Sequence, residues 1–237
     1  MTTDTSGCVD SDWNAFVAEW LAGLFLRPLA IETVRSLREG PGAALLGALA
    51  LQPGCGPGAR RMREIVLAGD NPAEVARDLS NEFILLFDGV GGPRTASPYE
   101  SAYFGFSRRL FQAPTSEINR LLRQADVSVS SDVKEPADHL SIELALRGRM
   151  MRESASCRNK CALLDLHLMA FAPMLADKCL EADRAGFYAA AADLMLGFVR
   201  ALRDAFSGRS RPSTLPVGDD EIAVAPGASK PPERPPS

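Results

Sequence analysis

The stretch of sequence that decides the fold is Asn81-Glu82-Phe83-Ile84-Leu85-Leu86-Phe87-Asp88-Gly89. Val75, Leu79, Phe83 and Leu86 follow a helical stripe, and the neighbouring residues make the last turn apolar on nearly all sides. Such a helix end is either buried on several sides or keeps a face for a partner. The glycine- and proline-rich turn after it exposes backbone beside apolar groups, which suits peptide binding. A buried corner of the core explains the same residues, so both interpretations stay open.

Helical patterns continue on both sides of this stretch. Asn71, Pro72 and Glu74 read as an N-cap, a proline at the first helical position and an acid in the first turn. Ser11 and Asp12 are cap residues before a periodic stripe of seven apolar residues: Trp13, Phe16, Val17, Trp20, Leu21, Leu24 and Phe25. Further helices are predicted over 31–39, 43–51, 99–111 and 114–125, from Pro136, from about Asn159, and up to Gly208. No convincing alternation with a period of two residues appears, so the predicted fold class is all-α.

The same patterns suggest how the chain is divided. Residues 126–135 are polar and poor in helix formers, so we interpret them as a hinge between an N-terminal helical set, 11–125, and a C-terminal set, 136–207. Residues 1–10 are expected to be disordered. Residues 208–237 are rich in proline with little to bury, so we expect a disordered tail there as well.

Composition narrows the classes of function. Net charge is −4 and the sequence pI is about 5.3, which does not favour nucleic-acid binding. The first residues lack the pattern of an export signal, and no run of 18 apolar residues suggests a membrane span. The five cysteines are odd in number and scattered, which is typical of reduced thiols. We therefore expect a soluble, cytoplasmic protein.

Few residues are available for catalysis or metal binding. The only histidines are His139 and His167, and no nucleophile elbow or phosphate-binding loop is found. Cys157, Cys161 and His167 could in principle hold zinc, but a fourth ligand is not evident. We therefore expect no metal and no cofactor. The alternative to a binding protein is an all-α enzyme that uses Asp138 and His139 as an acid/base pair.

Three segments, taken in order, resemble the TorD/DmsD/NarJ family of redox-enzyme maturation chaperones. The family patterns are E-[YFW]-x-x-L-F-x-G, P-[YW]-x-S-x-[YW] and E-P-x-D-H-[IL]. They are matched here by residues 82–89 (Glu-Phe-Ile-Leu-Leu-Phe-Asp-Gly), 98–103 (Pro-Tyr-Glu-Ser-Ala-Tyr) and 135–140 (Glu-Pro-Ala-Asp-His-Leu). The resemblance covers roughly residues 12–206. Phe83 and Glu100 depart from residues common at those places in the family, which leaves the recognised peptide undefined.

The resemblance implies a two-part helical bundle of the TorD/DmsD type. It implies a cytoplasmic chaperone, not an enzyme, that binds the twin-arginine signal peptide, the apo form, or both, of a molybdopterin-dependent oxidoreductase before export. The partners would be that apo-enzyme's catalytic subunit and its signal peptide, and a homodimer is possible. The peptide-binding residues would be Phe83, Leu86, Phe87, Pro98, Tyr99, Glu100, Tyr103, Glu135, Pro136, Asp138 and His139.

Within that set we assign two roles by residue type. An apolar groove formed by Phe83, Leu86, Phe87, Tyr99 and Tyr103 would take the apolar core of the signal peptide. The acids Glu82, Asp88, Glu100, Glu135 and Asp138 would meet its arginines. Burial of four or five apolar side chains, less the cost of ordering the peptide, gives an expected affinity around micromolar.

Overall fold

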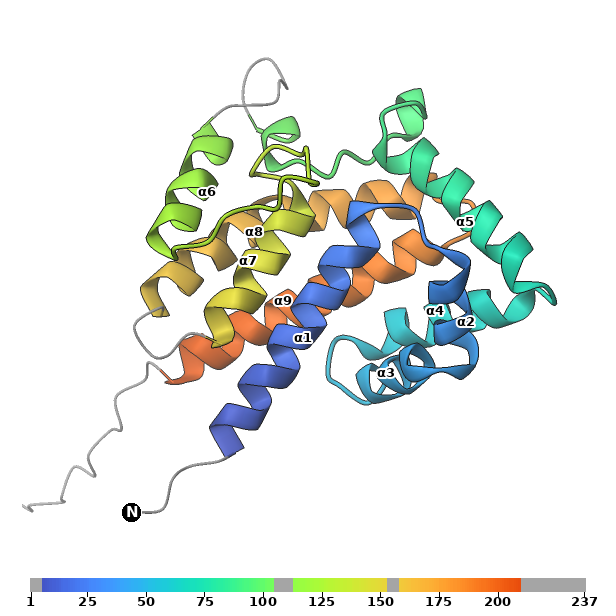
Figure 1. Cartoon of the computed structure of the whole chain (residues 1–237), viewed down its shortest axis with the longest axis horizontal. Coiled ribbons are helices and arrows are strands. Elements are labelled where there is room, and N and C mark those ends of the chain that lie inside the picture. Colours follow the sequence, from blue (N-terminus) through green and yellow to red (C-terminus); the bar gives the residue numbers. More distant parts are fainter. Residues whose placement is uncertain (1–5, 105–112, 153–157, 210–237) are drawn as a thin grey trace, which may run out of the picture.

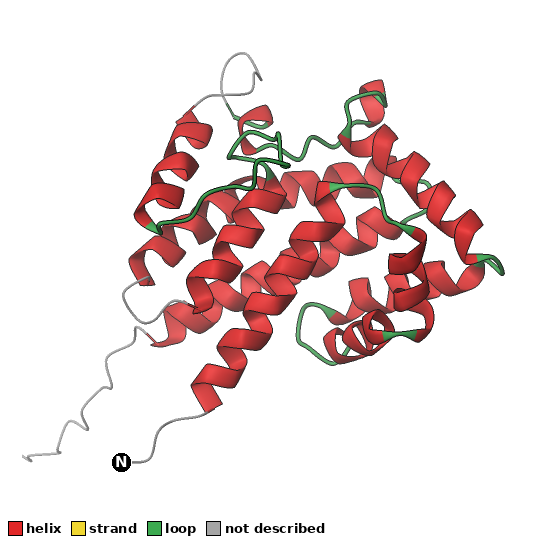
Figure 2. Ribbon diagram, in the orientation of Figure 1, coloured by secondary structure: helices red, strands yellow, loops and turns green. Residues whose placement is uncertain are grey.

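The structure is a computed structural model that describes residues 6–104, 113–152 and 158–209. Within these ranges the chain forms α-helices, short 3-10 turns and loops, and no strands (Figures 1 and 2), which confirms the all-α prediction. The elements are α1 (Ser6–Leu26), α2 (Ile31–Glu39), α3 (Pro41–Leu49), α4 (Gly56–Ala68), α5 (Pro72–Phe87), the 3-10 turns η1 (Gly92–Arg94) and η2 (Glu100–Ala102), α6 (Ala113–Gln124), α7 (Leu140–Arg152), α8 (Arg158–Ala182) and α9 (Phe187–Arg209).

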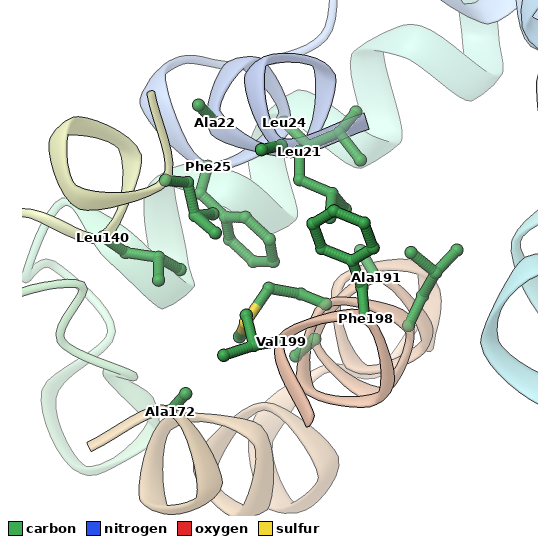
Figure 3. Close-up of a cluster of buried hydrophobic side chains, with 14 of the residues drawn as sticks. Leu21, Ala22, Leu24, Phe25, Leu140, Ala172, Ala191, Phe198 and Val199 are labelled. Carbon is green, nitrogen blue, oxygen red and sulfur yellow. The ribbon is translucent and has the colours of Figure 1, made fainter. Parts of the chain in front are cut away.

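Four helices form the centre of the molecule: α1, α7, α8 and α9. Helix α1 packs along α7, and α9 packs against α8 and α4, while α2 contacts α3 and α5 at one end (Figure 1). Figure 3 shows the core where Phe25 of α1 and Phe198 of α9 lie near Leu140 of α7 and Ala172 of α8. Both predicted helical sets thus contribute to one hydrophobic cluster. The division of the chain at residues 126–135 stays a prediction.

Helix α7 is joined to α8 by a buried ion pair. The Nε and Nη2 atoms of Arg147 donate to the two carboxylate oxygens of Asp165 at 2.6 and 3.2 Å. Both side chains are almost completely buried. The bidentate geometry gives the pair a fixed orientation, so it sets how α7 lies on α8.

Local cap signals are followed at some helix starts and overruled at others. The Asn71 side chain accepts a hydrogen bond from the N–H of Ala73 at 2.9 Å, with Pro72 as the first helical residue, as predicted. Helix α1 instead begins at Ser6. Its start is therefore earlier than the Ser11–Asp12 cap predicts and falls inside the segment expected to be disordered.

Two other predicted helix starts are wrong. Residues 99–104 form the 3-10 turn η2 and its flanks, not the start of an α-helix, and the rest of the predicted helix lies outside the described residues. Pro136 does not begin α7, which starts at Leu140. The backbones of the two segments pair with each other. Because the N–H of Leu140 donates to Pro98 and the carbonyl of Asp138 accepts the N–H of Glu100, these groups are not available to a helix that begins at Pro136.

In the described ranges, no helix combines the length and the apolar composition needed to cross a membrane.

The backbone of α9 lies in direct contact with the backbone of α4 and of the loop before it, and glycine residues allow this close approach. A Cβ atom on Gly58 would lie 2.5 Å from the carbonyl oxygen of Ala190, and one on Gly197 would lie 2.0 Å from that of Gly54. Both contacts are with backbone, which cannot move aside as a side chain can. The packing of α9 on α4 therefore depends on Gly58, and its packing on the loop before α4 depends on Gly197.

We expect Gly58→Ala to lower the free energy of unfolding by about 1–3 kcal/mol, because the added methyl group forces the two helices apart. Urea unfolding measures this. Gly23→Ala in α1 is the matched control, since a Cβ atom there meets nothing within 4 Å and alanine favours the helix by about 0.5–1 kcal/mol. Equal effects of the two substitutions would contradict the close contact.

Candidate functional site

The second and third family-like segments lie against each other. Tyr99 and His139 form an isolated antiparallel bridge. The N–H of Glu100 donates to the carbonyl of Asp138 at 3.0 Å, and the N–H of Leu140 donates to that of Pro98 at 2.8 Å. Figure 2 shows the loops that carry the two segments side by side above the helices. We call this paired unit, residues 98–103 with 135–140, the junction.

Asp138 anchors the junction from within. Its side chain is completely buried. One carboxylate oxygen accepts the N–H of Ser101 at 3.0 Å, and the other accepts the hydroxyl of Thr115 at 2.7 Å. A buried carboxylate is stable only when its oxygens are hydrogen-bonded. Asp138 therefore ties η2 and the start of α6 to the segment that precedes α7.

His139 serves as a cap for α7. Its Nδ1 accepts the N–H of Ser141 at 3.1 Å, and the ring of Tyr99 stands edge-on to it with 5.0 Å between ring centroids. Burial lowers the pKa of His139 to about 4, although the charges of Glu135 and Asp138 act in the opposite direction. The imidazole is therefore neutral at pH 7, as an acceptor at Nδ1 must be. The side chains of Asp138 and His139 bond to different partners and do not form an acid/base pair.

Glu100 connects the junction to α8. Its carboxylate lies 2.8 Å from Nδ1 of buried His167, whose Nε2 is 3.1 Å from the carboxylate of Glu117 on α6. The hydrogen bond to Glu100 raises the pKa of His167, and burial opposes that rise. His167 was considered in the sequence only as a metal ligand. Its link to Glu100 spans 67 residues and leaves no local signal.

Glu135 and Asp88 are the predicted acids that keep contact with solvent. Glu135 is half-buried and accepts the hydroxyl of Tyr99 at 2.5 Å. Asp88 is exposed at the end of α5. Burial raises the pKa of Asp88 and the negative charge of Glu135 raises it further, so the two carboxylates lie near each other. We call Asp88 and Glu135 the acid pair.

The three apolar residues of the first family-like segment that were predicted to bind the peptide lie in the core. Phe83, Leu86 and Phe87 are almost fully buried. The rings of Phe83 and Phe87 both pack edge-on against Tyr188 of α9, at 5.6 and 5.4 Å. In this conformation they offer no surface to a peptide, and their predicted role in binding stays a prediction. Glu82 is buried as well and accepts the N–H of Arg184 at 3.1 Å.

A hollow of about 430 Å³ opens on the other side of the second segment. It is lined by Thr95, Ser97, Ala102, Tyr103, Met174, Asp177 and Lys178. The hydroxyl of Tyr103 donates to the carbonyl of Ser97 at 2.8 Å, and its ring lies 5.9 Å from that of Phe171. Tyr103 was predicted; Met174 and Asp177 were not, because their place on α8 becomes part of a site only after folding.

The remaining predicted residues also belong to the junction. Pro98 is buried and Pro136 is half-buried. The structure therefore brings together Pro98, Tyr99, Glu100, Tyr103, Glu135, Pro136, Asp138 and His139, and it places Phe83, Leu86 and Phe87 in the core below.

The described part of the chain contains no candidate metal site. It holds no group of three or more His, Cys, Asp or Glu side chains arranged for a metal ion. Cys157, one of the three candidate ligands, lies outside the described residues. Cys55, Cys161 and Cys179 are buried, and burial raises the pKa of Cys55 to about 11, so that thiol is poorly suited to ionise.

The structure defines an all-α protein with a hydrogen-bonded junction and an acid pair beside it. Comparison with known proteins identifies the family. The family model described as "Nitrate reductase delta subunit" matches residues 50–177. The chain is 32% identical over 186 residues to the chaperone protein TorD of Ferrimonas balearica, covering 76% of this chain and 83% of the relative. It is 30% identical over 195 residues to chaperone protein TorD of Vibrio parahaemolyticus, covering 76% and 88%.

The chain belongs to this family, as the three segments predicted. Its named relatives are chaperones, so it is a TorD-like chaperone and not an enzyme.

We expect Thr115→Val to lower the free energy of unfolding by about 1.5–3 kcal/mol. The substitution keeps the shape of the side chain but leaves one oxygen of buried Asp138 without its donor. Urea unfolding followed by circular dichroism measures the loss. Thr33→Val in α2 is the control, and an equally small effect at both positions would show that the Asp138 anchor contributes little.

We expect the contribution of His167 to stability to depend on pH. Because its pKa is raised in the folded state, its stabilisation is complete below the ordinary value of about 6.5 and is lost as pH rises through the folded value. His167→Gln should therefore destabilise most at low pH, and the difference from wild type should shrink as pH rises. Urea unfolding across this range checks it, with Lys178→Gln as a pH-independent control. A difference that grows with pH would contradict the Glu100–His167 pair.

Proposed function

We propose that this protein is a cytoplasmic, system-specific chaperone of a molybdopterin-dependent oxidoreductase. It binds the enzyme's twin-arginine signal peptide, its apo form, or both, while the cofactor is inserted and before export. The observation that carries this proposal is the similarity to TorD chaperones over about three quarters of the chain. The cytoplasmic location follows from the proposed client, which is met before export.

The acid pair is the proposed contact for the two arginines. Five acids were expected to meet them. Three of those are buried and have internal partners: Glu82 with Arg184, Glu100 with His167, and Asp138 with Ser101 and Thr115. Glu135 is half-buried and accepts the Tyr99 hydroxyl. Asp88 and Glu135 remain within reach of solvent. Burial raises the pKa of Asp88, and the negative charge of Glu135 raises it further; a guanidinium placed between the two carboxylates would relieve that repulsion.

The hollow is the proposed contact for the apolar part of the signal peptide. Its apolar surface comes from Ala102, Tyr103 and Met174. The segment that begins at Thr95 in the lining of the hollow continues to Tyr99, which is bonded to Glu135 of the acid pair. A signal peptide has a basic end followed by about 7–15 apolar residues. Residues 95–103 would then lie along the peptide, with the acid pair at its basic end and the hollow at its apolar part.

The competing enzyme hypothesis receives no support. Asp138 accepts hydrogen bonds from Ser101 and Thr115, and His139 accepts one from Ser141. Both side chains therefore stabilise the local structure. The possible homodimer stays a prediction.

We expect Asp88→Asn combined with Glu135→Gln to weaken binding of a twin-arginine signal peptide by about 5- to 30-fold. Each partly exposed contact with an arginine is worth about 0.5–1 kcal/mol, more where it is bidentate. Isothermal titration calorimetry measures it. A peptide with both arginines replaced by lysine should bind the two proteins more nearly alike, because the acid pair then has no guanidinium to distinguish.

Asp78→Asn is the matched control, since Asp78 is an exposed acid ten residues earlier on α5. It should leave the affinity unchanged. Undiminished affinity in the double variant would place the arginines elsewhere. Failure of any twin-arginine precursor to co-purify with the wild-type chaperone from cells would overturn the proposed function itself.

A further inference from the structure

Glu143 is a buried acid without a hydrogen-bond partner. It lies in the first turn of α7 and its exposed fraction is 0%. Neither carboxylate oxygen has a partner among the residues that the structure describes. An ionised carboxylate in such a place is strongly unfavourable, and a group of this kind keeps its proton instead.

The groups around Glu143 act in the same direction. Burial raises its pKa well above the ordinary value, and the charges of Glu100 on η2 and Asp138 in the preceding segment raise it further. Two basic residues of this region form ion pairs with acids other than Glu143. His167 of α8 lies between Glu100 and Glu117 of α6. Arg147, one turn along α7, is bonded to Asp165 of α8. His139, the cap of α7, is neutral at pH 7.

The position of Glu143 connects its charge to the junction. The N–H groups of Ile142 and Glu143 both donate to the carbonyl of His139, at 2.8 and 3.1 Å. His139 in turn pairs with Tyr99 across the junction. Glu100 and Asp138, the two acids that repel a charge on Glu143, stand on opposite sides of that pairing and are joined by the hydrogen bond from the N–H of Glu100 to the carbonyl of Asp138.

We propose that Glu143 is a proton-controlled latch: it holds a proton while the junction is closed, as in this structure, and loss of that proton opens the junction. A third negative charge beside Glu100 and Asp138 is relieved when residues 98–103 separate from 135–140 and water reaches the carboxylates. Opening also uncovers Pro98, Asp138 and His139, which are buried in the closed form and were predicted to bind the peptide. The link to peptide binding rests on the proposed function; the latch itself does not.

The direction of the pH effect follows from linkage. The closed form binds one more proton than the open form, so the open population rises with pH, by up to about tenfold per pH unit. His167 shifts stability in the same direction, because its stabilising proton is also lost as pH rises. Wild type alone therefore does not separate the two groups, whereas replacing Glu143 by a neutral residue of the same shape does.

The test is hydrogen exchange in the full-length protein, wild type and Glu143→Gln, from about pH 6 to about pH 9, above the ordinary carboxyl pKa. Protection factors are compared at the amides of Glu100 and Leu140, which cross the junction, and at Ala59, which bonds to Cys55 in α4. In wild type we expect the junction amides to lose protection with pH, up to tenfold per unit, while Ala59 does not. In Glu143→Gln the loss should be clearly smaller. Glu181→Gln, an exposed acid on α8, should behave as wild type.

A pH-independent junction in wild type, or an unchanged pH dependence in Glu143→Gln, would overturn the latch. Infrared spectroscopy adds a readout on wild type that holds even if the variant folds poorly. A protonated carboxyl band should disappear in step with the loss of junction protection, and its absence at low pH would also overturn the latch.

Peptide titration over the same pH range separates the two proposals. A latch seen by exchange without any peptide binding would leave the latch standing and refute the proposed function. Peptide binding with a pH-independent junction would leave the proposed function standing and refute the latch.

Discussion

The buried carboxylate of Asp138 is the constraint on which the rest of the site depends. Through one side chain and one carbonyl it holds Glu100, Ser101 and Thr115, so the segment before α7, the turn η2 and the start of α6 have one fixed arrangement. A hydrogen bond to a charged group contributes about 1.5–3 kcal/mol, and an unsatisfied buried carboxylate costs more than that. This is why the junction lies in irregular structure and still has a defined shape: its backbone groups are satisfied by distant segments instead of by helical neighbours.

Burial divides the acids of this region into two kinds. Glu82, Glu100 and Asp138 each have an internal partner and determine how segments meet. Asp88 and Glu135 have contact with solvent, and Glu135 also accepts the Tyr99 hydroxyl. Glu143 fits neither kind, because it is buried like the first and its carboxylate has no hydrogen-bond partner among the described residues. A folded protein that keeps such a group bears a cost in stability, and a group of this kind makes the structure responsive to protons.

The sequence predicted what depends on neighbours along the chain. The all-α class followed from periodicity, and the Asn71 cap lies two residues from the N–H that it accepts. Predictions failed where hydrogen bonds to residues far away in the sequence determine the local structure. Pro136 looks like a first helical residue, yet Leu140, which begins α7, is bonded to Pro98 across the junction. Two of the motif segments form the junction, but the sequence did not show which of their side chains face water. The partners that bury Asp138 and Glu100 are Thr115 and His167, and no spacing rule links residues 23 and 67 positions apart.

The acid pair and the junction share one hydrogen bond, and under the proposed function this would couple binding at the acid pair to closure of the junction. Tyr99 donates to Glu135 and also packs edge-on against His139, so it connects Glu135 of the acid pair to the junction. An arginine that bonds Glu135 competes with the Tyr99 hydroxyl for the same carboxylate. Weakening that bond loosens Tyr99 against His139, which favours the open junction. Thermodynamic linkage makes the effect reciprocal: whatever opens the junction, including loss of a buried proton, changes the affinity for the arginine by the same factor. Because Tyr99 belongs to both, ligand and proton can act on one equilibrium without touching each other.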